Sequence, residues 1–366
     1  MKKRSLALFL AAMMIASLLT GCGLGSGTLD SADASSDGDT QTADTQTENT
    51  DAPEGAITIK CGGSVTDDNP ITQGLYYFEK IIEERSGGMI QVEVFANCQL
   101  GAPRELIEAT MNGSLQMCES GVAAAASFTD KFKWTALPFL FEDREIALSF
   151  VDGEVGQAMS KRVQEEIGAV MLTYYENGYY SIINTKHPIT SPDDLKGMKI
   201  RTQESDVYLE TFKEFGSNPL PMSMTEAYTG LQQGTIDGMV TNFVLTHTTK
   251  YYEIVKYMTD LEQFYDLTGV YMNEDFFNSL SPENQALVSE CAYESAVYQR
   301  DLAEKAKQDA IDFLTDGNME VYFLTDDERQ AFKDLVGPVY DWFETNVDEP
   351  YLDEYLAEID RLVAEA

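Results

Sequence analysis

The chain has 366 residues, with 62 acidic against 25 basic side chains and a formal net charge of −37 at pH 7. Such acidity opposes binding to nucleic acid and argues against a phosphate-binding role, although it says nothing about the fold. Hydrophobic residues make up 43% of the chain, and its length is ample for two lobes.

The first 21 residues have the pattern of a secretion signal. The basic stretch Lys2 to Arg4 precedes an apolar stretch over residues 6–19 that is too short to span a bilayer. The sequence Leu-Thr-Gly that then leads into Cys22 resembles the lipobox of bacterial lipoproteins, in which the cysteine is lipidated and becomes the first residue. We therefore expect removal of residues 1–21 and a lipid on Cys22; an ordinary signal peptide with a chance cysteine is the alternative.

Residues 22–56 are expected to form a tether behind the lipid. The part from residue 23 to 55 contains no Lys or Arg and almost no large apolar side chain, but many Asp, Thr, Ser and Gly. Such a composition cannot bury enough apolar surface to offset the entropy of the chain. We predict a disordered acidic tether, with the folded part of the protein beginning at residue 57.

The folded part opens with alternating strands and helices. The pattern predicts strands over residues 57–61, 89–95 and 115–118, with helices over 70–86 and 103–112. This alternation is typical of a parallel sheet with helices on its faces.

The same pattern recurs further along the chain. It predicts strands over residues 198–202, 218–222 and 236–240, with helices over 207–215 and 225–233. Each copy has a similar turn from helix to strand, Gly-Ser-Leu-Gln from Gly113 and Gly-Thr-Ile-Asp from Gly234. The recurrence predicts two α/β lobes of one design.

Further strands are expected to connect the two lobes. Strands over 169–175 and 180–185 cross from one lobe to the other, and a strand over 264–272 returns. A helix over 282–314, a strand over 320–324 and helices over 326–344 and 350–364 complete the chain. The expected first lobe comprises residues 57–177 and 267–306, and the second comprises 178–266 and 307–366.

Motifs with diagnostic catalytic or metal-binding spacing do not occur. We find no Gly-x-Ser-x-Gly, His-Glu-x-x-His, Walker loop or dinucleotide fingerprint, and the two histidines lie far apart. We therefore expect no catalytic residue, no metal and no cofactor. The cysteines beyond Cys22 show no disulfide framework, and unpaired buried thiols are expected at Cys61, Cys98, Cys118 and Cys291.

Arg201 is the candidate binding residue that the residues themselves suggest. In the predicted strand 198–202, Met198 and Ile200 alternate with Lys199 and Arg201, which therefore share the other face. A guanidinium can hold a carboxylate through two parallel hydrogen bonds, which lysine cannot do. From this segment alone, a solvated strand face is the alternative.

A series of short motifs occurs in one order over most of residues 57–345. They are VFANCQLG at 94–101, LPFLF at 137–141, ENG at 176–178, DLKGMKIR at 194–201, NPLPM at 218–222, Tyr228 with Leu231-Gln232, DG at 237–238 and KYYE at 250–253. In this order and spacing the chain resembles the substrate-binding proteins of tripartite ATP-independent periplasmic (TRAP) transporters, in their dicarboxylate-binding branch.

The resemblance implies an α/β, two-lobe periplasmic-binding-protein-like fold with hinge-crossing strands and long C-terminal helices. It implies a lipid-anchored receptor outside the cytoplasmic membrane, in the extracytoplasmic or periplasmic space. That receptor closes on a small organic acid and delivers it to a permease driven by an ion gradient. In the family, the arginine that matches Arg201 binds the substrate carboxylate bidentately. A monomer is expected, because opening and closing need no symmetric partner.

Two positions depart from the family pattern. A second arginine often follows Asn-Gly-aromatic, where this chain has Tyr180, and Thr241 stands where the family has an asparagine that contacts the ligand. We therefore expect a ligand with one carboxylate and a less anionic remainder, aromatic or hydroxylated. Ser120, at the end of the third strand, and Met224 are further candidates for the pocket wall; ordinary packing is the alternative for both.

Three other functions remain as alternatives. A receptor that presents its ligand to a membrane sensor kinase is the alternative among binding proteins. A secreted two-lobe enzyme would need a nucleophile, metal or acid–base set that the sequence does not offer. A purely structural surface lipoprotein would bind no metabolite.

Overall fold

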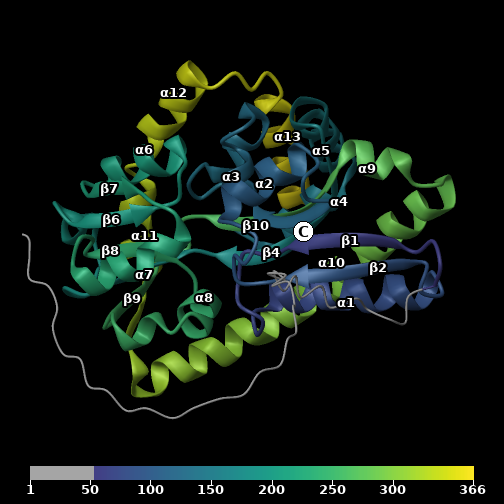
Figure 1. The fold of residues 1–366 in the computed structure, drawn as a ribbon. Helices are drawn as coiled ribbons and strands as arrows, with labels where there is room; N and C mark the ends of the chain where they lie inside the picture. The colour runs from purple at the N-terminus through teal and green to yellow at the C-terminus, as the bar shows by residue number, and fades with distance from the viewer. Residues whose placement is uncertain (1–52) are drawn as a thin grey trace, which may run out of the picture. The chain divides into compact units, whose positions relative to one another are not determined.

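Two β-sheets organise residues 53–366, the part of the chain that this computed structural model describes (Figure 1). The predicted signal peptide, Cys22 and all but the end of the predicted tether lie outside the described residues. The sheets confirm the two-lobe α/β prediction, with one sheet for each lobe.

The first sheet has the strand order β2-β1-β3-β10-β4. Its strands are β1 (Ile57–Gly62), β2 (Ile90–Phe95), β3 (Met117–Gly121), β4 (Ala169–Tyr179) and β10 (Tyr265–Asn273). β1 is parallel to β2 and β3, whereas β10 is antiparallel to β3 and β4. The first three strands thus form the expected parallel unit, although β3 lies nearer the C-terminus than the predicted strand 115–118.

The second sheet has the strand order β11-β9-β5-β8-β6-β7. Its strands are β5 (Ser181–Asn184), β6 (Lys199–Thr202), β7 (Asn218–Pro221), β8 (Gly238–Thr241), β9 (Tyr257–Asp260) and β11 (Glu320–Phe323). β6 is parallel to β7 and β8, so the predicted second copy of the unit is present. The two copies share their turn as well: Gly113 and Gly234 have φ of 77° and 70°, a left-handed conformation that favours glycine.

Helices cover both sheets, and the start of α1 follows from the sequence. α1 (Pro70–Arg85) begins where the Asn69 side chain accepts a hydrogen bond from the Ile71 amide, with Pro70 in the first turn. The other α-helices are α2 (Pro103–Met111), α3 (Val122–Ala125), α4 (Arg144–Asp152), α5 (Glu154–Ile167), α6 (Asp206–Glu214), α7 (Met224–Gln233), α8 (Phe243–Thr248), α9 (Glu274–Ser279), α10 (Pro282–Phe313), α11 (Asp326–Lys333), α12 (Gly337–Asn346) and α13 (Leu352–Glu365).

The chain crosses between the sheets at two adjacent places. β4 passes into β5 with only Tyr180 between them, as the predicted crossing strands require. The return differs from the prediction, because β10 lies wholly in the first sheet and the crossing is made by the residues between β9 and β10. The amide of Tyr180 donates to the carbonyl oxygen of Phe264 at 2.8 Å, so the two crossings are paired.

The C-terminal third links the two sheets. α10 packs against α1 and β4 and also against α8, and Figure 1 shows it running along both sheets. The predicted helix 326–344 is divided into α11 and α12. The proline near the start of α12 suits a first helical turn, because backbone N–H groups in that turn have no partner within the helix. α13 packs against α4 and α5. The predicted lobe boundaries remain a prediction, and this packing favours assigning α13 to the first lobe.

Candidate functional site

A cavity of about 800 Å³, partly open to solvent, lies between the carboxyl ends of strands from the two sheets. The first sheet and its loops contribute Ser64, Glu119, Gly121, Asp266 and Thr268, and the second contributes Arg201, Gln203, Met222 and Met224. Ligands of open α/β sheets bind at this end of parallel strands. Both lobes therefore supply walls to one candidate site.

Arg201 lies in this cavity and is only 4% exposed. Its Nε donates to the carbonyl oxygen of Met222 at 2.8 Å, which fixes the guanidinium. Burial lowers the pKa of Arg201 below its ordinary value, because the charged form is poorly solvated. No ion pair within residues 53–366 involves Arg201. The solvated-face interpretation is therefore wrong, and the remaining guanidinium donors are available to an anion.

Tyr180 also lines the cavity, and its hydroxyl forms a hydrogen bond with a carboxylate. The Tyr180 Oη donates to Asp266 Oδ2 at 2.8 Å, and Asn177 Nδ2 donates to the same oxygen at 2.8 Å and to Tyr180 Oη at 3.1 Å. Burial, followed by the nearby Asp266 charge, raises the pKa of Tyr180. Tyr180 is therefore a neutral donor whose proton is directed at Asp266.

Two buried carboxyl groups that were not predicted from the sequence also line the cavity. Glu119 is 1% exposed and accepts hydrogen bonds from the amide and hydroxyl of Ser64, the amide at 2.8 Å. Burial raises the pKa of Glu119 to about 7 and that of Asp266 to about 6. Strand alternation was the signal that could have found Glu119, since it shares a face with Gly121, whose partner Thr268 also lines the cavity.

The other three predicted residues have different places. Met224 lines the cavity, and its sulfur accepts a hydrogen bond from Tyr251 at 3.8 Å. Ser120 is fully buried, and its hydroxyl donates to the carbonyl oxygen of Pro103 at 3.0 Å. Thr241 is buried in β8, with no hydrogen-bond partner for its hydroxyl among the residues described. The structure therefore brings Met224, but neither Ser120 nor Thr241, to the cavity wall.

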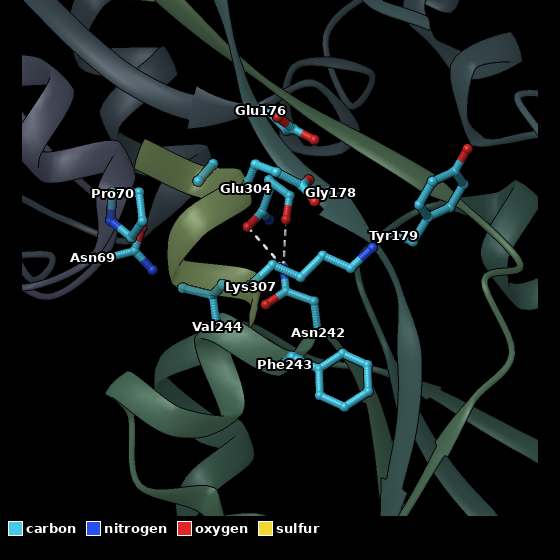
Figure 2. Close-up of a pocket in the computed structure, with 12 residues that line it drawn as sticks. Asn69, Pro70, Glu176, Gly178, Tyr179, Asn242, Phe243, Val244, Glu304 and Lys307 are labelled. Atoms are coloured by element: carbon cyan, nitrogen blue, oxygen red, sulfur yellow. Dashed lines mark hydrogen bonds between the residues drawn. The ribbon is translucent and has the colours of Figure 1, made fainter. Parts of the chain in front are cut away.

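A second cavity, of about 420 Å³, lies beside the crossing strands (Figure 2). There Asn242 Nδ2 donates to the backbone oxygen of Asn177 at 2.7 Å and to its Oδ1 at 2.9 Å. Lys307 extends from α10 towards Tyr179, with its Nζ 5.7 Å from the ring centroid. Asn242 also caps α8, so this cavity surrounds a structural junction. The cavity with the buried Arg201 is the better candidate for a ligand.

Three further findings concern possible metal sites, membrane spans and thiols in the described part of the chain. Residues 53–366 contain no group of three or more His, Cys, Asp or Glu side chains that could hold a metal ion. In the same range, the structure contains no helix whose length and hydropathy suit a membrane span. Cys61, Cys118 and Cys291 are buried free thiols, as predicted, whereas Cys98 is a free thiol that is partly exposed.

Comparisons with known proteins agree with this architecture. The family described as bacterial extracellular solute-binding protein, family 7 (DctP) matches residues 61–346. The 2,3-diketo-L-gulonate-binding periplasmic protein YiaO of Escherichia coli is 33% identical over 273 residues, which cover 74% of this chain and 82% of that protein. The C4-dicarboxylate-binding periplasmic protein DctP of Rhodobacter capsulatus is 30% identical, with 78% of this chain and 86% of that protein covered.

Solved structures give the same result at the level of the fold. The sugar acid binding protein of Advenella mimigardefordensis in complex with galactonate has a TM-score of 0.81 and 27% identity, covering 84% of this chain and 99% of that one. A TRAP periplasmic solute-binding protein of Sulfurospirillum deleyianum with bound succinate has a TM-score of 0.78, 27% identity and coverages of 84% and 99%.

The two lobes and the cavity between them define an extracytoplasmic solute-binding protein. The chain belongs to family 7 of the bacterial extracellular solute-binding proteins. Within that family it is a solute receptor of a TRAP transporter, as its sequence motifs predicted. Members of the family are receptors rather than enzymes.

Proposed function

We propose that the chain binds one carboxylate of a small organic acid at Arg201 and closes its two lobes around that acid. The observation that carries this proposal is a buried guanidinium that lines the cavity without an ion pair to any described residue. Tyr180 and Met224 line the same cavity and are proposed to contact the remainder of the acid. The relatives with bound galactonate and succinate support a carboxylate as the shared chemistry.

A second part of the proposal concerns the place where the receptor works. The lipobox pattern supports a lipid on Cys22, which would hold a monomeric receptor on the outer face of the cytoplasmic membrane near the permease. The receptor is proposed to release the acid without altering it chemically. Replacement of Cys22 by Ser is expected to release the protein from the membrane fraction, and retention of the variant there would contradict the anchor.

The experiment that tests the ligand site starts from a thermal-shift screen over organic acids. A ligand at 100 times its dissociation constant stabilises the folded state by about 2.7 kcal/mol, which a screen detects readily. For the acid so found, calorimetry on Arg201→Ala is expected to show a loss of about 2–5 kcal/mol, roughly 30- to several-thousand-fold in affinity.

The matched control is Arg104→Ala. Arg104 lines the same cavity, but it is exposed and its guanidinium carbon lies 4.8 Å from the ring centroid of Phe128. Loss of this rim cation is expected to change affinity only slightly, since exposed charges are well screened. Unchanged affinity in Arg201→Ala would overturn the proposed function.

A further inference from the structure

The buried charges that line the cavity are opposite at its two ends, whereas Arg104 and Glu204, which also line it, are exposed. The arginine end is Arg201, on β6 of the second sheet. The carboxylate end is Glu119 on β3 together with Asp266 on β10, both in the first sheet. No ion pair joins the two ends within the described residues, so each end is available to a ligand.

No cation among the described residues pairs with the carboxylate end, because Arg104 of the same lobe is exposed and its guanidinium lies over the Phe128 ring. The hydrogen bonds that Glu119 accepts all come from Ser64, and those of Asp266 come from Asn177 and Tyr180, which are neutral donors. Neither carboxylate forms an ion pair with another residue in the range 53–366. Two buried carboxylates that face one cavity without a counter-charge are costly to ionise, and a ligand that supplies a positive charge would remove that cost.

Acceptor atoms at the cavity also remain available. Both oxygens of Asp266 could accept, yet only its Oδ2 has hydrogen-bond donors among the described residues. The Oε1 of Gln203, on the segment that follows Arg201, is buried with no partner. Gln203 belongs to the arginine end, so the acceptor left over at the carboxylate end is the second oxygen of Asp266, which favours a ligand group that donates hydrogen bonds there. A protonated amine has three donors and a full positive charge.

We infer that the ligand is an amino-bearing carboxylic acid whose ammonium group binds between Glu119 and Asp266 while its carboxylate binds Arg201. The inference rests on the proposed function, because it assigns the second end of the same site. A ligand with both charges bridges the two sheets, so each charge gains its partner only when both lobes contact the ligand. Opposite charges in the cavity thus couple ligand recognition to lobe closure.

Matched ligand pairs test this inference. Straight-chain ω-amino acids are compared with ω-hydroxy acids of the same length, by thermal shift and then calorimetry. Each pair shares its carboxylate and differs only in the group that meets the carboxylate end. In the pairs that bind, the amino acid is expected to bind about tenfold or more tightly. Equal or tighter binding of the hydroxy acids, or no binding by any amino acid, would overturn the inference.

Variants then assign the effect to the carboxylate end. Glu119→Gln and Asp266→Asn keep the shape of each side chain but remove its charge, and each is expected to lower affinity for the amino acid by about 30-fold or more. Affinity for the matched hydroxy acid is expected to change far less. The control is Glu93→Gln, which removes an exposed carboxylate from β2 of the same sheet and leaves the preference for the amine intact.

The outcomes separate this inference from the proposed function. If hydroxy acids bind better than amino acids but Arg201→Ala still abolishes their binding, the inference fails and the carboxylate function stands. If Arg201→Ala binds every acid as the wild type does, the proposed function itself fails. If Glu119→Gln and Asp266→Asn leave the preference for the amine unchanged, the amine binds elsewhere and the inference is wrong.

Discussion

Both sheets present strand ends to the cavity, but the buried charges at those ends are opposite. In the second sheet, β6 carries Arg201, whose one hydrogen bond to a described residue goes to the Met222 carbonyl. In the first sheet, β3 and β10 carry Glu119 and Asp266, which neutral donors orient. The carboxyl end of β6 thus supplies a buried cation in one lobe, whereas the carboxyl end of β3 and the amino end of the antiparallel β10 supply buried carboxyl groups in the other.

This difference shows how a repeated fold acquires asymmetric recognition. The backbone pattern brings strand ends together, while single side chains decide which charge each lobe offers. Both ends are buried, so each charge destabilises the folded state when it has no partner and interacts strongly with an opposite charge when it has one. The contrast can be tested by changing one end at a time.

The largest effect among single conservative changes is expected from Arg201→Lys. Lysine keeps the charge but lacks the planar fork that holds a carboxylate through two hydrogen bonds. We expect a loss of about 2–3 kcal/mol, roughly 30- to 200-fold in affinity, by calorimetry. Arg104→Lys at the exposed rim serves as the control. Full affinity in Arg201→Lys would show that the arginine end acts as a point charge, not as a bidentate clamp.

At the boundary between the two ends, Tyr180→Phe is expected to lower the free energy of unfolding by about 1–3 kcal/mol. The change removes one of two neutral donors to the buried Asp266 and leaves Asn177 as the other. Chemical denaturation measures the effect. Tyr179→Phe is the matched control, because the buried hydroxyl of Tyr179 has no hydrogen-bond partner among the described residues. A loss in Tyr179→Phe as large as that in Tyr180→Phe would contradict the role of the Tyr180–Asp266 bond.

Much of the fold could be predicted because periodicity and capping residues are local signals. Asn69 and Pro70 mark the start of α1, and Gly113 and Gly234 mark the two equivalent turns. Boundaries that depend on tertiary pairing were less accurate. The strand 264–272 was predicted as a crossing, but hydrogen bonds to β3 and β4 place β10 within one sheet.

The candidate site was predicted in part for the same reason. Arg201 and Tyr180 belong to motifs with fixed spacing, and both line the cavity. Glu119 and Asp266 belong to no such motif, and strand alternation alone does not single out Glu119 because acids are common in a chain with 62 of them. Their importance follows from burial and from the pairing of β3 with β10, which joins residues more than a hundred positions apart. Only the three-dimensional structure contains that information.

The carboxylate end also predicts a dependence of stability on pH. The pKa of Glu119 is raised to about 7 and that of Asp266 to about 6, so the folded state binds more protons than the unfolded state. The free energy of unfolding should therefore fall as pH rises from about 4 to about 7, by about 1.4 kcal/mol per unit for each group while it titrates. Glu79 and Asp260 have raised pKa values too, so the wild type alone does not isolate the effect.

The double variant Glu119→Gln, Asp266→Asn provides the comparison. Its unfolding free energy should depend less steeply on pH than that of the wild type, as denaturation at a series of pH values would measure. Equal slopes would mean that neither carboxyl has a raised pKa in the fold. Binding of an amino-bearing acid should likewise flatten the wild-type slope, because an ammonium group stabilises the ionised carboxylates.

The smallest effect on binding is expected from Ser120→Ala, although Ser120 was predicted as a pocket residue. Its neighbours Glu119 and Gly121 face the cavity, so alternation along β3 turns Ser120 to the opposite face. The variant loses a hydrogen bond to the Pro103 carbonyl, worth about 1 kcal/mol of stability, while ligand affinity should stay unchanged. Ser64→Ala is the counterpart on the cavity side, since its hydroxyl orients Glu119. A loss of affinity in Ser120→Ala but not in Ser64→Ala would show that Ser120, and not Glu119, faces the cavity. That result would contradict the assignment of the carboxylate end.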